Sequence, residues 1–257
     1  MGRVMVPLLR RVLLASLGVA VAAATAAPAA LPAALPEHVS IERAVASTTS
    51  VTGPHTYELY RHGATTKPVQ WLACRSIDYR INTASEPAGM TGLIRSVMTS
   101  IGKQTGVSFR YAGTTTHAFG STSFDHANPT IYFAFTGKQD VAGQHFAWPG
   151  QIGVGGPAAA WYSTSVGGPT FEAMTYGRVL LYTGFKGRLT GAGSTWQSLI
   201  THEVGHALNL DHRTVHTDAM YPSLSEESPG RFSPAEVTAL KSVLQRTSCN
   251  YAAFKRL

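Results

Sequence analysis

Three histidines near the carboxyl-terminal end of the sequence constrain the fold more than any other feature. His202, His206 and His212 lie in the stretch THEVGHALNLDH, at intervals of four and six residues. Histidines four residues apart project from one face of an α-helix, about one turn from each other, so both imidazoles can reach one metal ion. A chain with this pattern must hold a helix at the site and bring a third ligand to the same point.

The sequence around the first two histidines predicts that helix. Ser194, with Gln197 three residues later, forms a capping-box pattern. In a continuous helix His212 would lie about 240° around the axis from His206. The helix must therefore end between them, and Asn209 can supply the turn because Asn tolerates the left-handed conformation that ends helices. Apolar residues at helical spacing predict a buried stripe: Trp196, Leu199, Ile200, Val204, Ala207 and Leu208.

Zinc suits this ligand set, because catalytic zinc sites use three protein ligands and keep a fourth position open for water. Glu226, twenty residues after His206, is the rival third ligand, at a spacing typical of a glutamate supplied by a second helix. Its segment, PSLSEESPG, begins and ends near prolines, which disfavours a helix there. We therefore predict one catalytic Zn²⁺ ion, bound by His202, His206 and His212.

The stretch HEVGHALNLDH resembles HExxHxxGxxH, the zinc-binding signature of the metzincin peptidases, and Asn209 stands where that signature has Gly. The following DAMYP places Met220 eight residues after His212 and resembles the Met-turn, most closely that of the matrixin family. The resemblance implies that the three histidines bind zinc and that Met220 lies in a turn beneath the metal. It also implies that Glu203 is the general base, which takes a proton from zinc-bound water and passes it to the leaving amine. Tyr221 would either contact substrate or simply pack.

The resemblance further implies a metzincin-like α+β fold, with a twisted mixed β-sheet and three main α-helices. The active-site zinc helix would be followed by the Met-turn and a C-terminal helix. Sequence patterns predict elements in a compatible order: a strand at 77–81, a helix at 92–106, strands at 107–112, 129–135, 151–157 and 177–184, the zinc helix, and a last helix from Ser233. The segment QIGVGGP could be an edge strand that pairs with an extended peptide, although its glycines equally suit a loop.

The N-terminus reads as a secretory signal peptide, residues 1–26. Arg3, Arg10 and Arg11 precede an apolar run that ends at Ala24, and Ala24-Thr25-Ala26 suits a small-residue cleavage site. The run is shorter than a membrane span needs, so we predict none in the mature chain. Residues 27–66 read as a linker or short pro-segment, and residues 67–257 as the catalytic domain of a secreted, extracellular protein.

Charge and cysteine content narrow the partners further. The predicted signal peptide holds three of the 21 basic residues and none of the 14 acidic ones, which leaves a net charge of about +4 in the mature chain. These basic residues are scattered, so we expect no nucleic-acid partner. Cys74 and Cys249 predict one disulfide in an oxidising compartment. Four other potential ligands, His117, Asp125, His126 and His145, match no metal-binding spacing.

These observations predict a secreted, monomeric zinc-dependent endopeptidase of matrixin-like metzincin type that acts on protein or peptide substrates. Two alternatives share its ligands. One is a secreted zinc-stabilised binding module without turnover, and the other is a zinc-dependent amidase acting on non-protein amides. Substitution of Glu203 separates the enzyme from the binding module, and only the substrate separates the peptidase from the amidase.

Overall fold

A mixed β-sheet with helices packed on it forms the part of the chain that the computed structural model describes, namely residues 70–71, 76–117, 129–137, 146, 150–163, 170–244 and 255–256. The predicted signal peptide, the segment 27–66 and both cysteines lie outside the described residues. In chain order the elements are β1 (Gln70–Trp71), β2 (Ile77–Ile81), α2 (Met90–Thr105), β3 (Phe109–Thr114), β4 (Thr130–Thr136), β5 (Gly153–Ser163), β6 (Thr170–Tyr182), α3 (Trp196–Ala207), α4 (Pro234–Leu244) and β7 (Lys255–Arg256).

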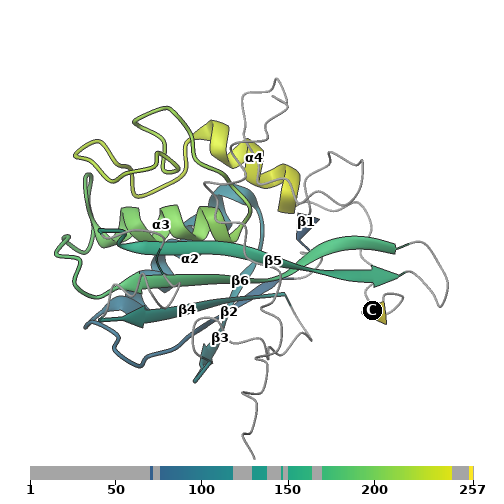
Figure 1. The fold of residues 1–257 in the computed structure, drawn as a ribbon. Coiled ribbons are helices and arrows are strands. Elements are labelled where there is room, and N and C mark those ends of the chain that lie inside the picture. The colour runs from purple at the N-terminus through teal and green to yellow at the C-terminus, as the bar shows by residue number, and fades with distance from the viewer. Residues whose placement is uncertain are drawn as a thin grey trace, which may run out of the picture. The chain divides into compact units, whose positions relative to one another are not determined.

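The strands follow the order β3-β2-β4-β6-β5-β7, and β1 pairs with β6 at Ala173 and Met174 (Figure 1). The pairings from β3 through β6 are parallel, whereas β5 runs antiparallel to both β6 and β7. The predicted mixed sheet is therefore confirmed. Within the described residues, the outer side of β5 pairs only with the two residues of β7, opposite Tyr162 and Ser163.

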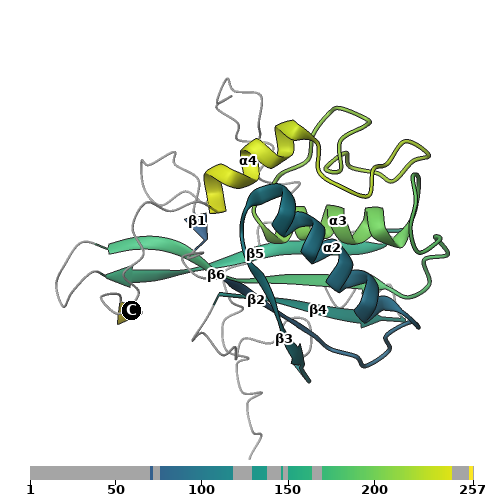
Figure 2. The same ribbon diagram turned by 180° about the vertical axis from the view of Figure 1, so that it is seen from behind.

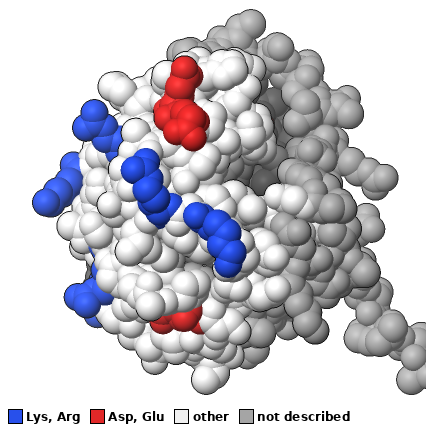
Figure 3. Space-filling model, turned by 90° about the vertical axis from the view of Figure 1, so that its left-hand side faces the viewer, with Lys and Arg blue, Asp and Glu red and all other residues white. Residues whose placement is uncertain are grey.

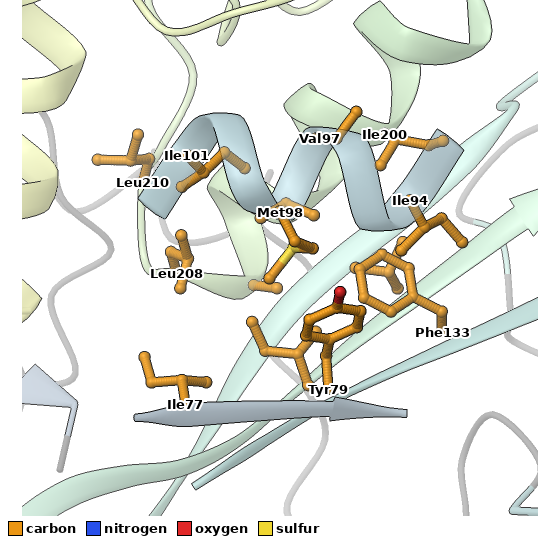
Figure 4. Packing of buried hydrophobic residues seen from close by; sticks show 14 of the residues in the cluster. Ile77, Tyr79, Ile94, Val97, Met98, Ile101, Phe133, Ile200, Leu208 and Leu210 are labelled. Carbon is orange, nitrogen blue, oxygen red and sulfur yellow. The ribbon is translucent and has the colours of Figure 1, made fainter. Parts of the chain in front are cut away.

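Continuous apolar runs build the middle of the sheet. In β4, the sequence TIYFAF is buried along its whole length, as expected for a strand covered on both faces. Helix α2 buries one apolar stripe, which includes Ile94, Met98 and Ile101. In this stripe Met98 extends toward the sheet and Ile94 lies near Phe133 (Figure 4). Helix α2 also contacts α3, the helix that carries His202 and His206.

All three described helices lie on the same side of the sheet (Figures 1 and 2). Helix α3 packs on β5 and β6, and α2 contacts both α3 and α4. Every residue of α3 except Gln197 is buried. The predicted single buried stripe was therefore too narrow, because α3 is enclosed on one side by the sheet and on another by α2. A helix enclosed in this way can hold polar groups away from water.

Two strands are longer than the sequence predicts. The predicted strand 151–157 extends to Ser163, and the predicted strand 177–184 begins at Thr170, so β5 and β6 form a long antiparallel pair. The added part of β5 is AAAWYS, and alanine is a poor strand former on its own. Pairing with β6 supplies the hydrogen bonds that local preference does not.

The exterior agrees with the scattered charge of the sequence. On the face shown in Figure 3, basic side chains are interspersed with uncharged surface and acidic groups. Among the described helices, none is both long enough and apolar enough to cross a membrane.

Candidate metal centre

The structure brings the three predicted histidines to one point. Nε2 of His206 lies 3.1 Å from Nε2 of His202 and 3.1 Å from Nε2 of His212. The three residues form a group whose ligand atoms all lie within 4.8 Å of one another. Zinc bonds of about 2.0 to 2.1 Å in tetrahedral geometry place ligand nitrogens roughly 3.3 Å apart, so the spacing fits a zinc ion.

The hydrogen bond made by Nδ1 of each ring determines the tautomer of the histidine, and so whether Nε2 carries a lone pair. Nδ1 of His202 lies 2.7 Å from the carbonyl oxygen of Ala219, and Nδ1 of His206 lies 2.9 Å from that of Leu210. A carbonyl only accepts, so each Nδ1 carries a proton and each neutral ring presents a lone pair at Nε2. Two lone pairs 3.1 Å apart cannot form a hydrogen bond with each other. A cation between them removes this repulsion, so the donor set fits a metal ion.

Burial keeps these ligands neutral in the metal-free protein. The pKa of His202 is lowered from 6.5 to about 4, mainly by burial and to a lesser extent by the nearby His212, against the hydrogen bond to Ala219, which raises it. Burial also lowers the pKa of His206 well below its usual value. Metal ligation requires the neutral imidazole, so at neutral pH both rings are ready to bind without losing a proton.

The turn after α3 brings His212 beside the other two histidines. Asn209 has φ 81°, a left-handed conformation, and its side chain is buried. The chain reverses there, and the N–H of Leu210 donates to the carbonyl oxygen of Gly205 at 2.9 Å. The same turn places the carbonyl of Leu210 against the ring of His206. The left-handed turn at Asn209 therefore both orients the ring of His206 and brings His212 beside it.

Glu203 lies beside the first ligand on α3, buried against the sheet. A Cβ added at Gly153 of β5 would overlap its carboxylate, and a Cβ added at Gly155 would overlap its backbone carbonyl. Burial raises the pKa of Glu203 from 4.5 to about 8 in the metal-free protein. A neighbouring cation opposes this effect, since a positive charge favours an ionised carboxylate. The two glycines thus let an outer strand approach the candidate base with no side chain between them.

Met220, the predicted Met-turn residue, lies against α3. Met220 is fully buried, and a Cβ added at Gly205 of α3 would overlap its sulfur atom. Tyr221 is partly exposed, and its ring stacks on that of His216 with centroids 4.3 Å apart. Oδ1 of Asp211 accepts a hydrogen bond from the N–H of His212 at 2.7 Å.

The other potential ligands considered from the sequence do not join the histidine group, or lie outside the described residues. Glu226, the rival third ligand, is exposed and is not in the histidine group. Of the four other potential ligands, His117 packs edge-on against Tyr132, and Asp125, His126 and His145 lie outside the described residues.

Sequence reasoning missed Gly153 and Gly155, whose roles depend on a strand–helix contact that no local pattern reports. It also missed Glu236, a buried carboxylate of α4 that contacts the turn at Met220. A signal for Glu236 was present, because Ser233 followed by Glu236 is a capping box. Only the folded chain reveals its second contact.

No protein-family model and no curated protein matches the sequence. Among solved structures, the chain is similar to the crystal structure of archaemetzincin from Methanopyrus kandleri, with 10% sequence identity and a TM-score of 0.43, over 67% of this chain and 97% of that chain. The assignment of the metal centre therefore rests on the geometry of its own residues.

Proposed function

We propose that the protein is a secreted zinc-dependent endopeptidase of metzincin type, resembling the matrixins, in which Glu203 is the general base. One observation carries the proposal: hydrogen bonds to backbone carbonyls turn the lone pairs of His202 and His206 toward each other, and His212 reaches the same point. Among the described residues the group holds three potential ligands and no fourth, a number typical of catalytic rather than structural zinc.

Zinc, when bound, would activate water and polarise the scissile carbonyl. The residues of the chain supply the rest. Glu203 would accept a proton at its carboxylate and donate it to the leaving amine, which requires the ionised form at the start of the reaction. The burial of Glu203 keeps bulk water from competing for that proton.

We further infer that an extended substrate lies along β5, at Gly153 to Gly156. This stretch belongs to an outer strand that passes directly over Glu203. Backbone groups of an edge strand can pair with an added peptide strand, which would hold the scissile bond in a fixed register beside the base. The partly exposed Tyr221 is a second candidate contact for the substrate.

The decisive experiment measures cleavage of unfolded casein by the purified protein, with and without a chelator, beside the Glu203→Gln variant. We expect cleavage that the chelator abolishes and added zinc restores. The Gln variant should retain zinc but lose at least about 100-fold in activity, since proton transfer typically contributes 10²- to 10⁴-fold. Equal cleavage by a zinc-loaded Gln variant would remove Glu203 from the mechanism.

A pair of histidine variants provides the matched control for the metal. His212→Ala should lose zinc, whereas His216→Ala, an exposed histidine in the same segment, should keep it. If a folded, zinc-loaded wild-type protein cleaves neither casein nor short peptides, the peptidase proposal fails. Hydrolysis of small N-acyl amides would then favour an amidase, and the absence of any hydrolysis would favour the binding module.

A further inference from the structure

Glu236 is a buried carboxylate that the reaction does not use. It lies in the first turn of α4, and only 1% of its surface is exposed. Among the described residues, the groups that donate hydrogen bonds to its carboxylate are backbone N–H groups and not basic side chains. Burying a carboxylate is costly unless hydrogen bonds compensate. The hydrogen-bond donors that compensate the buried charge of Glu236 therefore show which segments this side chain holds in place.

Three backbone N–H groups donate to this carboxylate. The N–H of Met220 lies 2.7 Å from Oε1, while the N–H groups of Ala219 and Ser233 lie 3.2 Å and 2.7 Å from Oε2. The bond from Ser233 belongs to the capping box of α4, whose return bond, from the N–H of Glu236 to Oγ of Ser233, is 3.4 Å. The other two bonds reach outside the helix, to the turn beneath the histidines. One side chain therefore joins the start of α4 to that turn.

The carbonyl groups of the same two turn residues contact the segments that carry the candidate ligands. The carbonyl oxygen of Ala219 accepts from Nδ1 of His202 at 2.7 Å. The carbonyl oxygen of Met220 accepts from the N–H of Arg213, which directly follows His212, at 2.8 Å. All four backbone polar groups of Ala219 and Met220 are thus engaged, two with Glu236 and two with the segments that carry the ligands.

A second contact closes the segment between His212 and the turn. The side chains of Arg213 and Asp218 form an ion pair at 2.6 Å, and both are largely buried. The N–H of Asp218 donates to the carbonyl oxygen of Val215 at 3.0 Å. The segment is therefore a closed loop whose position depends on the turn, and the turn depends on Glu236.

We propose that Glu236 is a positioning residue of the metal centre: by fixing the Ala219-Met220 turn from below, it orients His202 and places His212 for zinc. The inference rests on the proposed zinc site. Groups that orient ligating histidines typically change metal affinity by 10- to 100-fold when they are removed. Glu236 does not contact a histidine directly, and acts on the candidate ligands through the peptide groups of the Ala219-Met220 turn.

Glu236→Gln tests this role with minimal change in shape. A glutamine has one oxygen and one amide NH₂ where the carboxylate has two oxygens. Because N–H groups face both positions, at least one donor must meet another donor. Ser233→Ala is the matched control, since it removes the capping hydroxyl of the same helix but leaves the bonds from Glu236 to the turn intact.

The measurement is the zinc dissociation constant of the full-length protein and its variants, by competition with a chromophoric chelator. We expect zinc binding about 10-fold or more weaker in Glu236→Gln and within about 2-fold of wild type in Ser233→Ala. Equal affinity in wild type and a folded Glu236→Gln variant would overturn the proposal, and so would equal weakening in both variants, which would indicate loss of α4 alone. A wild-type protein that does not bind zinc would instead refute the proposed function.

If the Glu236→Gln variant does not fold, Glu236→Asp can replace it, because aspartate keeps the negative charge. The shorter side chain cannot span from Ser233 to the turn, so zinc affinity should again fall, and unchanged affinity would contradict the proposal. The Nδ1 proton of His202 gives an independent readout by NMR, since a proton hydrogen-bonded to a carbonyl resonates at low field. Its signal should shift in the Glu236 variants and stay in place in Ser233→Ala.

Discussion

At the scale of single residues, the candidate metal centre depends on two kinds of position: those that need a histidine side chain, and those where any side chain would collide with a neighbour. The outer nitrogens of His202 and His206 are held by carbonyl groups, so the ring orientations are set before any metal binds. Gly153 and Gly155 meet the opposite requirement, because any Cβ there would collide with Glu203. The ligands could be recognised from their spacing, whereas the excluded side chains could not, because exclusion depends on which strand lies opposite.

Gly153→Ala tests this exclusion. The added methyl group would displace the carboxylate of Glu203 without touching a ligand, so we expect kcat/KM for casein to fall roughly 10- to 100-fold, the loss typical of a misplacement near 1 Å. Zinc content should remain that of the wild type. Gly92→Ala, an exposed position on α2, is the control, because a Cβ there meets nothing within 4 Å. An unchanged rate in Gly153→Ala would mean that the position of the carboxylate is not critical.

At the scale of elements, the sequence predicted the helices better than the strands. Helix α2 has a full stripe of apolar residues at helical spacing, a purely local pattern, and it appears at Met90–Thr105 against a predicted 92–106. Strands β5 and β6 depend on each other over eleven paired positions, so their extra length could not be predicted from either segment alone. The zinc-helix candidate begins as predicted to within one residue, but its cap is Thr195 rather than Ser194.

Replacing that cap should weaken α3 measurably. Oγ1 of Thr195 accepts from the N–H of Ser198 at 3.1 Å in a fully buried position. Thr195→Ala leaves that donor without its partner, and we expect the free energy of unfolding to fall by about 1 to 2 kcal/mol in chemical denaturation. Ser194→Ala, one residue earlier, should change it by less than about 0.5 kcal/mol. The reverse ranking of the two variants would restore Ser194 as the cap.

At the scale of the whole molecule, the buried histidines and Glu203 make the stability of the metal-free protein depend on pH. Below pH 6.5 an unfolded chain protonates its histidines, whereas the folded chain leaves His202 neutral down to about pH 4. Stability from the histidines is therefore lost as the pH falls through this window. Glu203 acts in the opposite sense, because the folded chain keeps it protonated up to about pH 8 and the unfolded chain releases the proton near 4.5.

We therefore expect the chelator-treated protein to be most stable near pH 6.5. Below this pH the loss from the two buried histidines exceeds the gain from Glu203; the pKa of Glu236, which burial also raises, acts in the same direction as that of Glu203, and above pH 6.5 only carboxyl groups act. The measurement is Tm between pH 4.5 and 8.5, followed by circular dichroism. In Glu203→Gln the decline on the alkaline side should become smaller. A Tm that rises steadily to pH 8.5 in the metal-free wild type would contradict the assignment of these pKa shifts.

The compact placement of the ligands has a consequence for the order of folding. His202 and His212 are ten residues apart in the chain, whereas the pairing of β1 with β6 joins Gln70 to Ala173. Closing the shorter loop costs about 2 kcal/mol less in chain entropy. The histidines, the left-handed turn and the Met-turn can therefore come together as a local structure. The long-range sheet pairings can follow, and metal present during folding can bind before the sheet that flanks it is complete.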